Sequence, residues 1–107
     1  MKLPDNIEGL IKAQNEFDSK AFAAFFTERA TIYDEGSSHL GRNEIRQWIQ
    51  QTTEKYNTQL KPIGYNQNET SAKLTVEVTG TFPGSSAVMQ YHLGLKDNLI
   101  SSLKITG

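Results

Sequence analysis

The sequence predicts an α+β protein in which three helices near the N-terminus pack on an antiparallel sheet. Apolar residues recur at helical spacing through most of the first half of the chain, and the period then changes from about 3.6 to about 2. The expected strands of the second half are joined by short turns, which is typical of antiparallel hairpins. The length of 107 residues suits one domain, so we expect a single domain over 1–107.

The three expected helices cover residues 5–16, 19–26 and 43–56. Two of them begin at residues that favour helix N-termini. Asp5 is expected to cap the first helix, with Glu8 three residues further on, and Asp18 is expected to cap the second. We therefore expect two short helices separated by a sharp turn, with a longer third helix later in the chain.

Each helix has an apolar side that needs a partner. The second helix presents Phe22, Phe25 and Phe26 at positions i, i+3 and i+4, which predicts deep packing. The third helix places Trp48 and Ile49 on one side and charged or amide side chains on the others.

Five strands are expected, over residues 30–34, 59–66, 72–82, 87–96 and 99–105. Turns are expected at 35–38 and 83–85. Pro62 has no N–H to donate, so its strand is predicted to lie at an edge or to contain a bulge. Asp97 and Asn98 both tolerate positive φ and predict a two-residue hairpin loop.

Composition excludes several classes of function. The chain has no cysteine, which rules out disulfides and thiolate metal sites. The net charge is −1 with interspersed signs, so we expect no nucleic-acid partner. The most apolar stretch, residues 21–26, is too short to cross a membrane and the N-terminal region has no signal-peptide core. We therefore expect no membrane association and a cytoplasmic location.

Local motifs along nearly the whole chain resemble those of the nuclear-transport-factor-2-like superfamily, in particular its SnoaL-like branch of polyketide cyclases and ketosteroid isomerase-like proteins. The matching stretches are Asp18–Phe26, Ala30–Asp34, His39–Ile45 with Trp48 and Ile49 behind it, Thr79–Ser85 and Leu95–Ile100.

The resemblance implies a cystatin-like cone, with three helices on a curved antiparallel sheet and a pocket at the wide end. It also implies a homodimer through the outer face of the sheet. Members include isomerase-like enzymes, cyclases, dehydratases and hydrolases, so the fold does not fix the reaction.

Asp34 is the candidate catalytic residue. It lies near a strand end on the same face as Ile32, and on an inner face its carboxylate would enter an apolar cone and act as a general base or acid. The alternative is a structural aspartate that caps a turn or pairs with Arg42 or Arg46.

Tyr33 and Tyr91 are candidate hydrogen-bond donors to an oxyanion. In a regular strand Tyr33 faces opposite Asp34, so the two do not share a pocket without a bulge. The alternative is a core or interface aromatic with a hydrated hydroxyl.

A set of large apolar side chains is expected to form the wall of a ligand pocket, since apolar pockets with a few polar groups are typical ligand sites. Each of them alone is better explained by ordinary core packing, and it is the set together that indicates a pocket. The set comprises Phe25, Phe26, Ile32, Trp48, Phe82, Met89 and Tyr91.

The two histidines give no metal site. His39 and His92 lie on different elements without ligand spacing, so we expect neither a metal nor a cofactor. His92 is also predicted to face away from Asp34, and no second acidic residue is placed beside a pocket tyrosine. The pairings used by dehydratases and by steroid isomerases are therefore both missing from the pattern.

Two hypotheses follow. The first is a SnoaL-like protein that binds a small, apolar, ring-containing molecule and acts as an isomerase or cyclase through proton transfer by Asp34. The second is a non-catalytic ligand-binding or homodimeric assembly module, with Val88, Gln90 and His92 on its interface. They differ in whether Asp34 lies in a cavity or in a surface ion pair.

Overall fold

The computed structural model describes residues 2–34, 36–84 and 86–107. Three helices and six strands follow one another along the chain. In order they are α1 (Asp5–Asn15), α2 (Ser19–Ala24), β1 (Phe26–Asp34), β2 (Ser37–Leu40), α3 (Gly41–Tyr56), β3 (Gln59–Gln67), β4 (Ser71–Thr79), β5 (Ala87–Lys96) and β6 (Leu99–Thr106).

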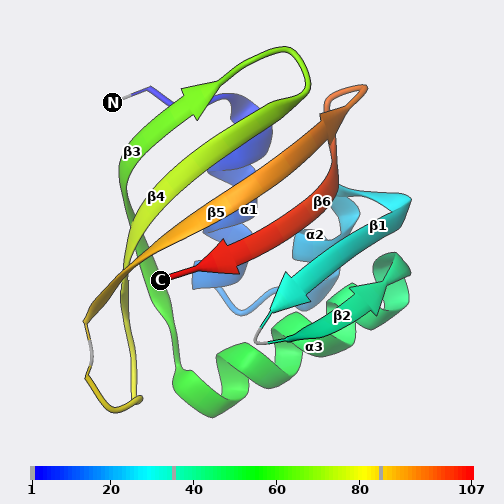
Figure 1. Ribbon diagram of the computed structural model, residues 1–107. Coiled ribbons are helices and arrows are strands. Elements are labelled where there is room, and N and C mark those ends of the chain that lie inside the picture. The colour runs from blue at the N-terminus through cyan, green and yellow to red at the C-terminus, as the bar shows by residue number, and fades with distance from the viewer. Residues whose placement is uncertain (1, 35, 85) are drawn as a thin grey trace.

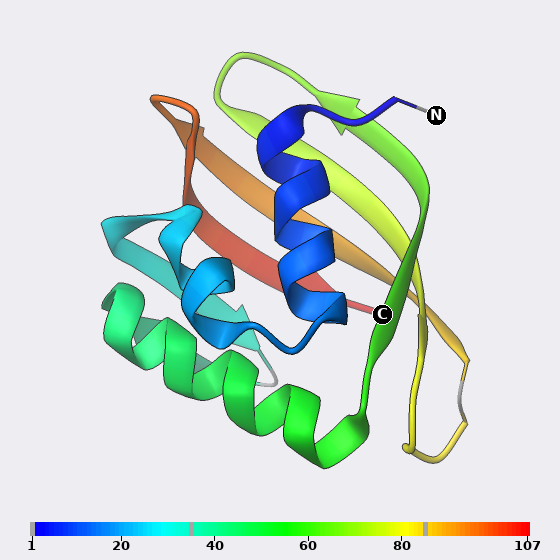
Figure 2. The same cartoon turned by 180° about the vertical axis from the view of Figure 1, so that it is seen from behind.

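All six strands form one curved sheet in the order β2-β1-β6-β5-β4-β3 (Figure 1). The three helices lie on one side of it, as the reverse view shows, and the other face carries no helix (Figure 2). This arrangement confirms the predicted α+β class with helices on one side of a sheet. One pairing departs from the antiparallel expectation, because β1 and β6 run parallel.

The core lies between the helices and the covered face of the sheet. Phe22 of α2 and Phe26 of β1 are fully buried, with ring centroids 5.3 Å apart. Along β4, Leu74 and Val76 are buried and alternate with more exposed residues, as a strand with one covered face requires. No helix in the described ranges is long and apolar enough to span a bilayer.

The helix boundaries correct two expectations. The N-cap of α1 is Pro4, whose carbonyl accepts from Ile7 and Glu8, and Asp5 is already helical, so its predicted capping role is wrong. Asp18 does cap α2 by accepting from the Ala21 N–H at 3.0 Å, as predicted. The helix ends at Ala24, and Phe26 begins β1 instead of continuing the helical face.

The strands correct two further expectations. Residues 37 and 38 were expected in a turn but pair with β1 as part of β2. Strand β4 ends at Thr79, three residues before the predicted end. Glu35 and Ser85, each part of an expected turn, lie outside the described residues.

Other local predictions are confirmed. Pro62 lies on the edge strand β3 beside a register shift between Pro62 and Gly64. Asp97 and Asn98 both have positive φ, at 52° and 65°, in the tight loop between β5 and β6.

Candidate ligand-binding site

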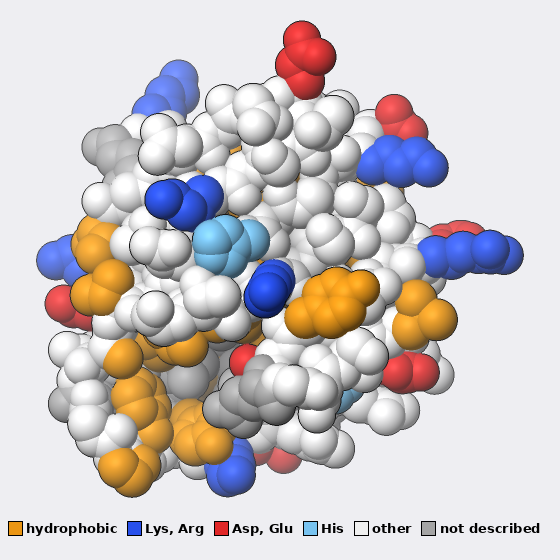
Figure 3. All heavy atoms as spheres, viewed as in Figure 1, with side chains coloured by type: hydrophobic (Ala, Val, Ile, Leu, Met, Phe, Trp, Pro, Cys, Tyr) orange, Lys and Arg blue, Asp and Glu red, His pale blue; other side chains and the backbone are white. Residues whose placement is uncertain are grey.

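A cavity of about 360 Å³ opens between the C-terminal half of α3, the end of α1 and the ends of strands β4 and β5. Hydrophobic side chains gather around a hollow over the β4–β5 connection, at the lower left of the space-filling view (Figure 3). The described residues that line it are Gln14, Asp34, Trp48, Thr52, Tyr56, Thr58, Val78, Phe82, Pro83, Gly84, Ala87, Met89, Tyr91 and Ile105. The wall is mostly apolar with a few polar groups, which suits a small organic ligand.

The outer wall forms where the β4–β5 connection meets the end of α3. The Thr81 N–H donates to the Tyr56 carbonyl at 2.7 Å, and the Tyr56 and Phe82 rings meet edge to face with centroids 6.1 Å apart. A Cβ at Gly80 would collide with the same Tyr56 carbonyl, so only glycine allows this close approach. These contacts hold Phe82 beside the cavity.

The inner wall is fixed by the end of α1. The Asn15 side chain accepts from the Leu60 N–H at 2.7 Å and donates to the Leu60 carbonyl at 3.1 Å, which joins the helix end to β3. The preceding residue, Gln14, is therefore held against the sheet and is only 3% exposed. Its amide oxygen accepts from the Tyr91 hydroxyl at 3.1 Å.

Tyr91 is kept protonated by its surroundings. Burial raises the pKa of the Tyr91 phenol well above its usual range, and the negative charge of Asp34 raises it further. The hydrogen bond between the Tyr91 hydroxyl and the Gln14 side chain acts in the opposite direction on this pKa. At neutral pH Tyr91 is thus a neutral hydroxyl close to a carboxylate, suited to donate a hydrogen bond.

Asp34 lies at the end of β1 and is oriented by α3. The Trp48 indole N–H donates to Asp34 Oδ2 at 3.2 Å. Among the described residues no protein group donates to Asp34 Oδ1, and no arginine or lysine forms an ion pair with this carboxylate. Arg42, one of the expected partners, donates instead to the Phe26 carbonyl at 2.8 Å.

Asp34 also borders another hollow, of about 240 Å³, between β2 and α3. The carboxylate is partly exposed and lies between the cavity and this hollow. A proton taken up by Asp34 from the cavity can therefore exchange with solvent from the other side.

Thr58 adds a polar group without a partner. It follows Asn57, whose left-handed conformation (φ 50°) ends α3, and it is 5% exposed. Its hydroxyl has no hydrogen-bond partner among the described residues. A buried hydroxyl left unpaired costs free energy, so the wall at Thr58 favours a ligand with a polar atom.

The structure brings together five of the eight residues predicted for the site, namely Asp34, Trp48, Phe82, Met89 and Tyr91. The other three are off the cavity wall. Phe26 and Ile32 are fully buried core residues, and Phe25 packs its ring against Gly9 of α1. Their expected place in the pocket is corrected, because the covered part of the sheet beneath α2 is filled.

Sequence reasoning missed the polar side of the cavity. Gln14 continues the stripe of Ile7, Leu10 and Ile11 at position i+7, so a polar residue on an apolar helix face was the available indication. Thr58 gave no such indication, because its burial depends on how α3 and β3 meet.

The remaining candidates lie elsewhere. Tyr33 is 50% exposed on the open face of the sheet, opposite Asp34 as its strand position predicts. The His39 ring lies 6.0 Å from Trp48, whereas His92 lies on the open face. Within the described ranges no three histidine or acidic side chains come together as metal ligands do.

Comparison with known proteins identifies the class of fold. No family model and no curated protein matches the chain. Among solved structures, a candidate polyketide cyclase from Sinorhizobium meliloti is 28% identical, with a TM-score of 0.92 over 97% of this chain and 95% of that one. A protein from Catenulispora acidiphila with a ketosteroid isomerase-like fold, solved with trimethylamine, is 17% identical, with a TM-score of 0.91 over 99% and 87%.

A third similar structure is an NTF2-like protein of unknown function from Cytophaga hutchinsonii, 15% identical, with a TM-score of 0.79 over 99% of this chain and 93% of that one. These likenesses confirm the nuclear-transport-factor-2-like fold and the resemblance to its SnoaL-like branch. They do not identify the reaction, which has to be inferred from the chemistry of the site.

Proposed function

We propose that this protein binds a small, apolar, ring-containing molecule that carries a hydrogen-bonding oxygen, and that it isomerises or cyclises this ligand by proton transfer. One observation carries the proposal: Asp34 and the neutral hydroxyl of Tyr91 line the same mostly apolar cavity. The likeness to a candidate polyketide cyclase at 28% identity supports the same class of chemistry.

Each group has a defined task. Asp34 Oδ1 takes a proton from a carbon next to a carbonyl, and the C–H electron pair moves into the carbonyl to give an enolate. The Tyr91 hydroxyl, which in the structure donates to Gln14 Oε1, turns its one proton to the enolate oxygen, and burial strengthens this hydrogen bond. Asp34 then returns the proton to another carbon in an isomerisation. In a cyclisation the enolate carbon attacks a second carbonyl of the same molecule, whose oxygen takes the proton.

Trp48 positions the base. Its indole N–H holds Oδ2 and leaves Oδ1 without a donor among the described residues, so this oxygen is free to act as the base. Phe82 and Met89 supply apolar contacts for a ring, and Thr58 and Gln14 supply polar contacts for a substituent.

The decisive experiment uses 2-tetralone, a two-ring ketone with acidic α-protons. We expect the protein to accelerate exchange of these protons into deuterated water, measured by proton NMR. The Asp34→Asn variant should lose this acceleration by about 100-fold or more, the usual contribution of a general base. Glu77→Gln, on the open face of β4, is the matched control and should retain it.

Equal exchange rates for wild type and Asp34→Asn would remove Asp34 from the mechanism. Binding of 2-tetralone can be followed separately through the indole N–H resonance of Trp48, the only tryptophan in the chain. A saturable shift of that resonance without any exchange would favour the non-catalytic ligand-binding function.

Homodimeric assembly through the open face of the sheet is the second candidate. It is favoured by two exposed hydrophobic residues on that face, Tyr33 and Val88, which are 50% and 53% exposed. Lys73 and Lys104 are exposed on the same face, so a symmetric dimer that brings these lysines of two copies together is disfavoured by charge repulsion. Light scattering at micromolar concentration tests it, since a monomer would count against assembly.

A further inference from the structure

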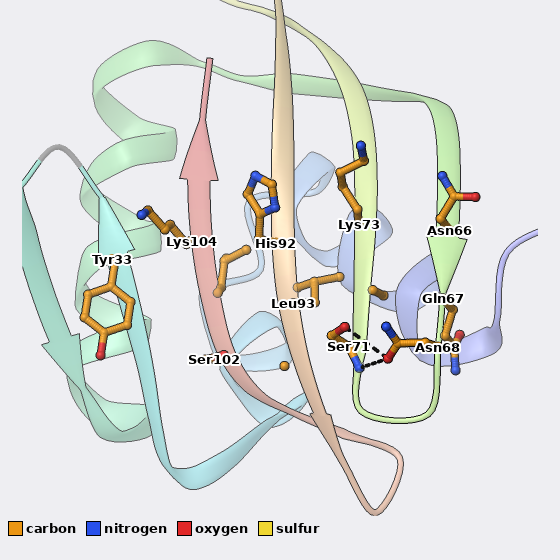
Figure 4. A pocket seen from close by; sticks show the side chains of 13 residues that line it. Tyr33, Asn66, Gln67, Asn68, Ser71, Lys73, His92, Leu93, Ser102 and Lys104 are labelled. Carbon is orange, nitrogen blue, oxygen red and sulfur yellow. Dashed lines mark hydrogen bonds between the residues drawn. The ribbon is translucent and has the colours of Figure 1, made fainter.

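Two lysines and a histidine stand side by side on the open face of the sheet. Lys73 of β4 is paired directly with His92 of β5, and His92 is paired directly with Lys104 of β6. Figure 4 shows the three side chains rising from neighbouring strands, with Tyr33 of β1 next to Lys104. We call Lys73, His92 and Lys104 the cationic row.

No acidic side chain among the described residues is paired with the row. No described lysine of the row forms an ion pair, and no described residue lining the surrounding hollow is acidic. In Figure 3 a histidine lies between two basic side chains on this face, with no carboxylate between them. Lys73 and Lys104 lie two strands apart with His92 between them, so an anion bound above His92 would be attracted by both ammonium groups.

A hollow of about 600 Å³ lies beside the row. Its floor comes from the residues two positions along each strand, where Ser71, Gly94 and Ser102 are paired in the same way. These residues are small, so the taller side chains of the row form a rim above them. A side chain at Gly94 would meet the hydroxyls of Ser101 and Ser102, which keeps this floor low.

The geometry suits one multivalent anion. Adjacent strands are about 4.8 Å apart, so Lys73 and Lys104 start roughly 10 Å from each other, within reach of one group above His92. His92 is held by a 2.9 Å contact between its Nε2 and the Thr106 hydroxyl, which leaves Nδ1 for the ligand. Lysine ammonium groups bind phosphate as point charges, and two of them converging on one group suit its multiple negative charge.

We propose that the cationic row and its hollow bind the phosphate group of a small soluble molecule, at a site separate from the cavity and on the opposite face of the sheet. The site would contribute ammonium donors from Lys73 and Lys104 and an imidazole donor from His92. The hydroxyls of Ser71 and Ser102 lie beside the phosphate, where the rest of the ligand would rest.

The test is an NMR titration of the isotope-labelled protein with inorganic phosphate, glycerol 3-phosphate and malonate, at constant ionic strength set with chloride. We expect saturable shifts of the backbone amides of β4, β5 and β6 around the row, with glycerol 3-phosphate bound at least as tightly as inorganic phosphate. The indole resonance of Trp48 should not move, which separates this site from the cavity and from the proposed reaction.

Two double variants with the same net charge provide the control. Lys73→Ala with Lys104→Ala should weaken phosphate binding about tenfold or more. Lys12→Ala with Lys20→Ala, on the exposed surfaces of α1 and α2, should leave it unchanged. All four lysines are exposed, so neither double variant should impair folding, and circular dichroism checks this.

Three outcomes would overturn the proposal. The first is an absence of saturable shifts at the row, and the second is an equal loss of affinity in both double variants. The third is tighter binding of malonate than of both phosphates, which would assign the site to carboxylates. A dimer by light scattering in which Lys73 and Lys104 are protected from acetylation would likewise show that a second copy covers this face.

Discussion

The two faces of one sheet differ in what their side chains are free to do. On the covered face, Leu74, Val76 and Leu93 are buried by helices, and two polar groups at its end, Gln14 and Tyr91, are hydrogen-bonded to each other. On the open face, Lys73 and Lys104 are exposed and without ion pairs among the described residues. The covered face therefore carries stability and the cavity, and the open face carries charge that contributes little to stability.

The largest expected change in stability distinguishes two adjacent residues of β4 that lie on opposite faces of the sheet. Leu74→Ala should lower the free energy of unfolding by about 2–5 kcal/mol, because it leaves a void in a filled core. Lys73→Ala, one residue earlier and on the open face, should change it by less than about 0.5 kcal/mol. Urea denaturation measures both, and similar values for the two would mean that the faces are not distinct.

The next largest expected effect is on ligand binding in the cavity. Ala87 lines it and Val88, the following residue, is exposed on the other face. Ala87→Phe should fill part of the cavity and weaken 2-tetralone binding about tenfold or more, because the ring and the ligand compete for the same volume. Val88→Phe is the matched control. Binding is measured by titration followed at the Trp48 indole resonance. Equal affinities of the two variants would contradict the assignment of this cavity as the 2-tetralone site.

A smaller effect is expected from the contact between Trp48 and Asp34. Asp34→Asn should reduce the free energy of unfolding by about 1–2 kcal/mol, since it removes the charge from a partly buried hydrogen bond. Glu77→Gln on the open face should stay within about 0.5 kcal/mol. Chemical denaturation of the two variants compares them directly. An unchanged Asp34→Asn would show that the indole contact adds nothing to stability.

The smallest expected change in stability comes from ionisation of Tyr91 and is seen only at alkaline pH. Because the folded pKa of Tyr91 is raised, its contribution to stability is fully present below the unfolded pKa near 10 and is lost as the pH rises toward the folded value. At about pH 10.5 the loss is below about 1 kcal/mol. Tyr91→Phe should not show it.

The Asp34→Asn variant tests whether the charge of Asp34 acts on the pKa of Tyr91. It removes the negative charge that raises the pKa of Tyr91, so the phenol should ionise at lower pH than in the wild type. Ultraviolet absorbance of the phenolate measures this, and an unchanged titration would place the Asp34 charge too far from Tyr91 to act on it.

Much of the fold follows from local sequence. The capping residue Asp18, the alternating strand Ala87–Lys96 and the loop at Asp97 and Asn98 were predicted at their observed positions, because each depends on a few neighbouring residues. Strand β2 was missed because Ser37–Leu40 is mostly exposed and polar, and it is a strand only through its pairing with β1.

The candidate site, too, is predictable from local sequence only in part. Alternation along β1 and β5 predicted that Asp34 shares a face with Ile32 and lies opposite Tyr33, and that Tyr91 lies opposite His92, because side chains on a strand alternate between its two faces. Alternation could not predict which inward residues would meet an empty space. Phe26 and Ile32 face inward into packed side chains, whereas Met89 and Tyr91 face the cavity.

The sequence by itself thus determined the elements, their faces and the class of fold, because these depend on periodicity and on short-range turn and capping chemistry. Only the tertiary structure decided where the helices stop covering the sheet, that Gln14 reaches Tyr91 over 77 positions of sequence, and that Lys73, His92 and Lys104 stand in one row. Each of these depends on the register and docking of elements far apart in the chain, which no local pattern specifies.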